Sequence, residues 1–375
     1  MKRVLSSLKR QVKSLDFFLL MPVLLASLYS LVLVLSATST ASRFYSRNFQ
    51  VQVAAVLLGI VAMLIIASID LDMLTSLWQL LYISTVLIVV VTILFGKGPT
   101  GTSNRNWLRL GPVNIQPSEF AKLSFILITA QTLDRIKESI NQFASLIYLI
   151  LVSGSLLGLM ALQKDTGTLL VYVFIFIVMV FCAGLDWRFF AAGGAVLTLL
   201  LPIAWNVMPD YMQKRILFGF KPELDPQKWG FQALQSKIAI GSGQMYGKGL
   251  FKGTQINLIP EHQTDFIFAT AGEEFGFIGS VAVLVLLLCI IYRVLVHANR
   301  ASTDTGTLVC TGVFAMLVAQ AMINIGMCLA IFPVIGITLP FFSYGGSSML
   351  ACWCAVGLVL SVNRQREMTL SFQNE

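Results

Sequence analysis

The chain has 375 residues, of which 57% are hydrophobic and 12% are charged, and its formal net charge is +8. Its apolar residues come in runs long enough to cross a bilayer, which excludes an ordinary soluble protein and indicates one membrane domain over residues 1–375. The positive charge fits membrane topology and anionic lipid, and no aromatic–basic platform supports nucleic-acid binding.

The hydropathy pattern predicts an all-α polytopic membrane fold with ten transmembrane helices and a large extracytoplasmic loop between spans 7 and 8. The predicted spans are 17–36, 50–69, 75–95, 117–133, 144–162, 166–184, 188–207, 266–297, 307–332 and 345–363. Lysine and arginine number twelve in the inner segments and six in the short outer loops, which places both termini in the cytoplasm.

The outer loop before the fourth span contains Arg105–Pro112, with Trp107 at its centre. A tryptophan between cations is typical of an interfacial anchor, and it could instead stack on a sugar or line a lipid groove. In the fourth span itself, Glu119 and Lys122 are three residues apart and share a helix face. They predict an intrahelical ion pair, a phosphate site at Lys122, or both.

The connection between the fifth and sixth spans reads Gln163–Thr168, and Asp165 in it can cap the next helix. The large loop 208–265 follows the seventh span, and short-loop charge rules do not explain its cations. These cations are Lys214, Arg215, Lys221, Lys228, Lys237, Lys248 and Lys252. Within the loop, 229–240 predicts an amphipathic helix on the membrane surface, and the glycines over 241–253 predict an irregular path.

Asp265 ends this loop and opens the eighth hydrophobic run. It could be a helix N-cap or first-turn acid, or it could be a general base or metal ligand at the membrane edge. The run 266–297 is too long for one straight span, and Gly272 and Gly276 allow a bend in it. Small residues over 343–348 allow close packing of the last span, and Asn324 is typical of an interhelical contact.

Motifs of soluble enzymes, such as GxxxxGK[ST], HExxH and GxSxG, do not occur in the chain. With only two histidines, His262 and His297, a Ser-His-Asp triad is not expected. One carboxylate opposite many cations at a membrane surface indicates chemistry on an anionic, lipid-linked substrate.

Together these stretches resemble the SEDS family (shape, elongation, division and sporulation), and most closely its RodA branch. The resemblance covers most of the chain, and its most specific parts are 105–122, 163–168, 235–255, 260–276 and 343–348. It implies a ten-span peptidoglycan glycosyltransferase of the bacterial cytoplasmic (inner) membrane that polymerises lipid II for cell elongation and rod shape. It also implies release of undecaprenyl pyrophosphate, a class B penicillin-binding protein (a transpeptidase) as partner, and other elongation-machinery proteins.

The resemblance carries over to single residues. Asp265 matches the family's essential aspartate, and Trp107, Glu119 and Lys122 match functionally sensitive positions near its lipid groove. Asp165 matches the acid of a Gln-Pro-Asp element, in which this chain has Lys164 at the proline position.

Two further departures concern the approach to Asp265. Gln263 stands where the family often has histidine, with His262 one place earlier, and the run 253–261 is shorter than usual.

These assignments predict a mechanism. Asp265 would be the base that activates the acceptor hydroxyl, or the ligand of a divalent cation such as Mg²⁺ or Mn²⁺. The cations expected at the substrate phosphates are, in falling order, Lys122, Arg215, Lys237 and Lys248. A lateral groove for the lipid is expected between the loop 97–116 and the opening of 266–297.

Two alternatives come from other functional classes. One is a flippase for lipid-linked precursors, which the concentration of charge on the outer side disfavours. The other is a scaffold without chemistry, which would tolerate Asp265→Asn.

Overall fold

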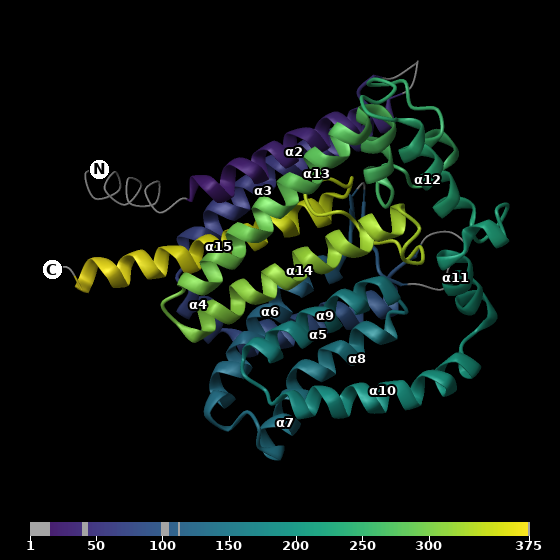
Figure 1. The fold of residues 1–375 in the computed structure, drawn as a ribbon. Coiled ribbons are helices and arrows are strands. Elements are labelled where there is room, and N and C mark those ends of the chain that lie inside the picture. Colours follow the sequence, from purple (N-terminus) through teal and green to yellow (C-terminus); the bar gives the residue numbers. More distant parts are fainter. Residues whose placement is uncertain (1–15, 40–43, 99–104, 112, 374–375) are drawn as a thin grey trace.

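The structure, a computed structural model, describes residues 16–39, 44–98, 105–111 and 113–373. The helices of the first half are α2 (Phe17–Thr38), α3 (Arg47–Ser68), α4 (Leu71–Ser76), α5 (Trp78–Phe95), α6 (Pro117–Ile136), α7 (Phe143–Leu149), α8 (Ser155–Leu162) and α9 (Thr166–Cys182). Those of the second half are α10 (Trp187–Val207), α11 (Asp210–Phe220), α12 (Phe231–Ser242), α13 (Ile267–Arg300), α14 (Asp304–Cys328) and α15 (Gly346–Gln373). The longer helices form one bundle, with α11 and α12 at the end opposite the C-terminus (Figure 1).

A helix lies at each of the ten predicted spans, and a π-helical stretch, Ile150–Gly154, joins α7 to α8. Among the described residues, eight helical segments are long and apolar enough to cross a membrane. The other two predicted spans correspond to α6, which has charged residues in its first and last turns, and to α9, which has only 17 residues. The mostly helical membrane fold is therefore confirmed, while the count of ten spans stays a prediction.

The loop between α5 and α6 is not wholly irregular, because part of it forms a small antiparallel hairpin. Strand β1 (Leu108–Leu110) pairs with β2 (Val113–Ile115), and Leu108 lies opposite Ile115. Gly111 supplies the left-handed turn conformation, with φ of 61°. Trp107 directly precedes β1 and pairs with Lys97, so the hairpin fixes its backbone at one end of the bundle.

The centre of the bundle is formed by α14 and α15, whose apolar segments are mostly buried. α14 packs against α6, α9 and α13, and α15 packs along α3. In contrast, no residue of α10 is buried, and this helix lies at the edge of the bundle (Figure 1).

α14 ends earlier than the sequence predicts. The predicted span 307–332 extends beyond the observed end at Cys328, and a non-helical segment follows up to α15. The helix stops because Ala330 adopts a left-handed conformation, with φ of 57°, and the amide of Ile331 turns back to bond the Gly326 carbonyl at 2.7 Å. The chain therefore leaves the helix early, and residues of the non-helical segment 329–345 line a cavity at this end of the bundle.

α13 is broken at Gly276, where φ is 66° and ψ is −156°, so the predicted bend is confirmed. The loop after α12 fits into the break. The amides of Lys248 and Gly249 donate to the carbonyls of Glu273 and Glu274 at 2.9 and 3.0 Å, and the amide of Phe277 donates to the Gln244 carbonyl at 2.8 Å. The break therefore leaves these backbone groups paired, as a membrane-embedded helix requires.

The predicted amphipathic helix 229–240 is observed as α12, and its buried side consists of small residues. The buried residues are Ala233, Ser236 and Ala239, and they pack toward α13. Small side chains let the two helices approach closely, whereas Ile238 stays exposed. α11 in the same loop was not predicted as a helix.

Candidate active site

A cavity of about 830 Å³ lies at one end of the bundle, lined by α9, α11 and the turn that precedes α13. It is also lined by the loop between α5 and α6 and by the non-helical segment before α15. Four predicted site residues line it together: Trp107, Asp165, Arg215 and Asp265. The lipid groove was expected between the loop 97–116 and the opening of 266–297. The loop lines this cavity together with the turn just before α13, whereas no residue of α13 itself does.

Asp265 lies in the turn that leads into α13, and its carboxylate reaches the cavity. The helix begins at Ile267 with Phe266 at its N-cap position, and no side chain caps it. The N-cap and first-turn interpretation of Asp265 is therefore wrong. Its amide donates to the Glu261 carbonyl at 3.1 Å, which closes the turn.

The surroundings of Asp265 bring the pKa of its carboxyl group close to neutral pH. Burial raises the pKa of Asp265 to about 7; the charges of Glu261 and Asp165 act in the same direction, and the Arg215 guanidinium opposes them. A general base is most effective when its pKa lies near the working pH. The carboxylate is thus suited to accept a proton from a substrate hydroxyl.

Arg215 comes from α11 and faces the same cavity. Its Nε donates to the Val334 carbonyl at 2.5 Å, which joins α11 to the segment before α15. Gly219 permits this contact, because a Cβ there would lie 2.4 Å from Cα of Pro333. Burial lowers the pKa of Arg215, and Asp265 and Asp165 oppose that shift. An arginine pKa is high enough that the side chain stays cationic.

Asp165 caps α9, so the capping interpretation is confirmed. Its Oδ1 accepts from the Thr168 amide at 3.1 Å, and its Oδ2 accepts from the Thr168 hydroxyl at 2.9 Å and from Asn106 Nδ2 at 2.8 Å. The bond to Asn106 fixes the residue next to Trp107, which exchanges two backbone hydrogen bonds with Lys97. Whether Asp165 also contacts substrate stays a prediction.

Lys164 stands where the resembled family has proline, and its backbone differs accordingly. Its φ is 59°, a left-handed value that the proline ring cannot adopt. The turn places an exposed cation at the cavity lining.

Glu119 and Lys122 form the predicted ion pair, with 2.8 Å between Lys122 Nζ and Glu119 Oε2. Both are buried, and they line a separate chamber of about 20 Å³, large enough for about one water molecule. Gln116, Gly336 and Thr338 line both spaces. Lys122 is thus behind the wall of the main cavity, and the structure does not support direct contact with a phosphate there.

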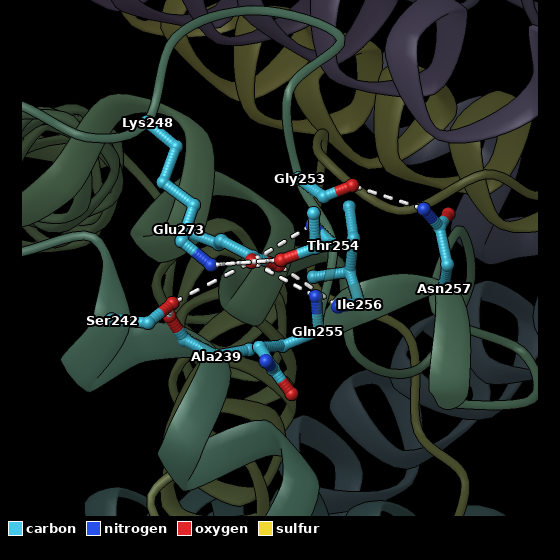
Figure 2. Close-up of polar contacts among 9 residues, drawn as sticks. All are labelled: Ala239, Ser242, Lys248, Gly253, Thr254, Gln255, Ile256, Asn257 and Glu273. Atoms are coloured by element: carbon cyan, nitrogen blue, oxygen red, sulfur yellow. Dashed lines mark hydrogen bonds and ion pairs between the residues drawn. The ribbon is translucent and has the colours of Figure 1, made fainter.

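Lys248 and Lys237 are the predicted phosphate ligands that the structure places elsewhere, since neither lines the cavity. Lys248 Nζ lies 2.5 Å from Oε1 of the fully buried Glu273. The same carboxylate accepts the amides of Thr254, Gln255 and Ile256 at 2.9, 2.9 and 2.8 Å (Figure 2). Lys248 therefore neutralises a carboxylate that holds the loop.

Lys237 forms a different and weaker contact. Its Nζ lies 3.6 Å from Glu223 Oε1, and both side chains are exposed. The cations that do line the cavity are Lys97, Arg109, Lys164 and Arg215, so only Arg215 of the predicted phosphate ligands is among them.

The sequence did not single out Glu261, which lies four residues before Asp265 and raises its pKa. A second acid one turn before the key carboxylate is the signal that could have found it. Asn106 was also missed, although it precedes Trp107 in the same motif. His262 is held elsewhere, since both ring nitrogens lie 2.9 Å from the backbone carbonyls of Ile259 and Ala37.

The donor groups near Asp265 limit how a divalent cation could bind. Within the described ranges, no three Asp, Glu, His or Cys side chains are grouped as metal ligands. A closed protein cage therefore does not fit. Mg²⁺ commonly binds through one or two carboxylates and substrate phosphates, and Asp265 with Glu261 fits that pattern.

The chain matches the FtsW/RodA/SpoVE family model, described as "Cell cycle protein", over residues 16–368. It is 34% identical to the peptidoglycan glycosyltransferase MrdB of Escherichia coli (strain K12), over 94% of this chain and 95% of that protein. It is 35% identical to stage V sporulation protein E of Bacillus subtilis (strain 168), over 93% of this chain and 97% of that protein.

Two solved structures share the fold. One belongs to a study of structural coordination of polymerization and crosslinking by a peptidoglycan synthase complex. It has a TM-score of 0.78 and 30% identity, and the match covers 94% of this chain and 98% of that one. The other is the rod shape determining protein RodA of Thermus thermophilus, with a TM-score of 0.69, 30% identity and coverage of 94% and 97%.

Proposed function

Because this chain belongs to the FtsW/RodA/SpoVE family and is a peptidoglycan glycosyltransferase, we propose that it polymerises lipid II into glycan strands with Asp265 as its general base. The observation that carries the proposal is the placement of this carboxylate, with its pKa of about 7, in a cavity lined by four cations. The likeness to MrdB and RodA supports a role in cell elongation and rod shape.

The reaction needs a base and a stabilised leaving group. Asp265 accepts the proton of the acceptor sugar hydroxyl. At the same time, the oxygen of that hydroxyl forms a bond to the anomeric carbon of the donor sugar. The bond from that carbon to the pyrophosphate breaks, and undecaprenyl pyrophosphate leaves with the electron pair. The base-activated attack opposite the leaving group follows the logic of inverting sugar chemistry.

The cations of the cavity suit the departing pyrophosphate. Arg215 presents a planar guanidinium that binds phosphate oxygens in pairs, and Lys164 adds a point charge. Glu119 and Lys122 support the wall formed by Gln116 and Thr338 from behind. Trp107 offers an aromatic face to a sugar or to the lipid.

A divalent cation such as Mg²⁺ or Mn²⁺ would be held by Asp265 and Glu261 and would supply charge stabilisation to the pyrophosphate. Apolar side chains in the cavity suit the polyprenyl tail. They include Leu169, Leu170, Ile216 and Val334.

We further propose that the chain lies in the bacterial cytoplasmic membrane with both termini inside. Its partner is a class B penicillin-binding protein that cross-links the glycan, together with other proteins of the elongation machinery. The solved peptidoglycan synthase complex, whose study concerns polymerization and crosslinking, supports this proposal by similarity.

The direct test is polymerisation of fluorescent lipid II by the purified protein in proteoliposomes, with and without the transpeptidase. We expect glycan ladders that increase when the partner is present. A protein that moves lipid II across the bilayer without making polymer would be a flippase instead. A protein that binds the transpeptidase and does neither would be a scaffold.

A further inference from the structure

We infer that Asn324 is a positioning residue for the Asp265 carboxylate, because its amide joins the backbone of Asp265 to the chain segment beside that carboxylate. The inference rests on the proposed function of Asp265. Asn324 lies near the end of α14 and does not line the cavity, so it would act on the reaction only through the position of Asp265.

The contacts of Asn324 are specific. The side chain is fully buried, and its Nδ2 donates to the carbonyl of Asp265 at 2.8 Å and to the carbonyl of Ile337 at 2.7 Å. An amide nitrogen carries two hydrogens, so both donors are used. The opposite orientation would set an oxygen against two carbonyl oxygens, so these contacts also fix which way the amide points.

The carbonyl of Asp265 needs this donor. In the first turn of α13, the amides of Ala269 and Thr270 bond the carbonyl of Phe266, at 2.9 and 3.3 Å. The carbonyl of Asp265 therefore lies just outside the helical ladder. The Cys328 thiol approaches it at 3.7 Å, but a thiol is a weak donor. Asn324 supplies the strong hydrogen bond at this point of the chain.

The second acceptor lies in the wall of the cavity. Ile337 follows Gly336, which lines the main cavity and has a left-handed φ of 78°. A Cβ at Gly336 would lie 3.2 Å from Oδ2 of Asp265, so this backbone passes directly beside the carboxylate. The side-chain amide of Asn324 thus fixes the distance between Asp265 and the backbone of Gly336 and Ile337, which lies beside the Asp265 carboxylate.

This arrangement differs from an ordinary contact between helices. Neither Asp265 nor Ile337 belongs to a helix, and each lies in a short irregular segment at the outer end of the bundle. Such segments have no hydrogen-bond ladder of their own to hold them. A donor from the rigid α14 gives them a fixed place.

The experiment compares two substitutions of Asn324 with a matched control. Asn324→Leu removes both donors and keeps a similar volume, and Asn324→Ser keeps one donor. The control is Ser236→Ala, which removes a buried hydrogen bond of 2.8 Å to the Cys328 carbonyl at the same end of α14. That bond reaches neither Asp265 nor Ile337.

We expect Asn324→Leu to lower kcat for lipid II polymerisation by about tenfold to a hundredfold, since small displacements of a reacting group have effects of that size. KM should change by less than about twofold, because the cavity cations are untouched. The acid limb of the pH profile should move to lower pH as the carboxylate gains solvent. Asn324→Ser should lie between this variant and wild type, and Ser236→Ala should match wild type.

A kcat near that of wild type in Asn324→Leu would overturn the inference. The inference would also be overturned if Asn324→Leu lowered the melting temperature and kcat but left the acid limb of the pH–rate profile unchanged. That result would indicate a structural role only. If Asn324→Leu does not fold, Asn324→Ser tests the inference instead. The acid limb of its pH–rate profile must then lie at a lower pH than that of wild type. A wild-type protein that makes no polymer would instead overturn the proposed function itself.

Discussion

At the scale of single residues, the decisive feature is a carboxylate that is held in the cavity without capping a helix. Its backbone is fixed by Asn324 and by the turn from Glu261. Burial and two neighbouring acids raise its pKa to about 7, against the opposing charge of Arg215. The balance of these charges determines at which pH the base is available.

This balance gives a pH prediction. Asp265 accepts a proton only when ionised, so kcat/KM should be low below pH 7 and should rise through about pH 7. Arg215→Gln removes the cation that lowers this pKa, so its acid limb should move to higher pH. Rates of polymerisation across this range would measure the shift. A limb at the same pH in both proteins would contradict the assigned roles.

A second prediction separates the two lysines that were expected at the phosphates. Lys248 neutralises the buried Glu273, so Lys248→Met leaves that carboxylate without its cation and should lower the free energy of unfolding by about 3–5 kcal/mol. The exposed Lys237 pair should contribute less than about 1 kcal/mol. Thermal unfolding in detergent measures both, with KM for lipid II as the second readout. If Lys248→Met raised KM for lipid II and left the free energy of unfolding unchanged, Lys248 would be a ligand of the substrate phosphates after all.

At the scale of elements, the break in α13 and the loop that enters it form one unit. The loop's amides pair with carbonyls freed by the break, and Glu273 collects three further amides. The approach is close because glycines stand at the crossing. A Cβ at Gly243 would lie 1.9 Å from the carbonyl oxygen of Gly272, and one at Gly247 would lie 2.1 Å from that of Glu274.

The crossing can be tested with two alanine substitutions two residues apart. Gly243→Ala should destabilise the protein by about 1–3 kcal/mol, because the backbone must move to admit the methyl group. Gly241→Ala has open space at its Cβ and lies within α12, so it should be neutral or slightly stabilising. Thermal unfolding in detergent compares them. Equal stability of the two variants would show that the crossing is not tight.

At the scale of the whole molecule, the described ends of the chain lie at the same end of the bundle, opposite the end that holds α11 and α12 (Figure 1). Residues of α11 line the cavity at that opposite end. Ion pairs hold the end where the described chain ends lie, including Asp16 with Arg293 at 2.5 Å and Lys137 with Asp304 at 2.9 Å. The positive-inside rule predicts that this end faces the cytoplasm. The cavity would then open at the outer surface, where lipid II presents its sugars.

A topology measurement checks this orientation. A reporter that is active only outside the cytoplasm should be silent when fused to the C-terminus. It should be active when inserted at the turn over 222–226, which joins α11 to α12. The reverse pattern would place the cavity inside the cell and would contradict the proposed polymerisation at the outer surface.

Much of this fold follows from the sequence, because long apolar runs and the glycines of α13 act through local physics. The pairing of Glu119 with Lys122 and the cap at Asp165 were predictable for the same reason, since their partners lie three residues away.

The burial of Lys248 against Glu273 depends on a loop path that no local pattern specifies. The amide of Asn324 likewise meets two segments that are distant in the chain. Such contacts are set by tertiary packing, and sequence patterns did not predict them.

The most direct test of the central claim is lipid II polymerisation by Asp265→Asn beside wild type, each purified with the partner transpeptidase. Asparagine keeps the shape of the side chain but cannot accept the proton. We predict that folding and partner binding stay intact while the polymerisation rate falls by at least about a hundredfold. Near-normal glycan synthesis by Asp265→Asn would contradict the assignment of this residue as the base.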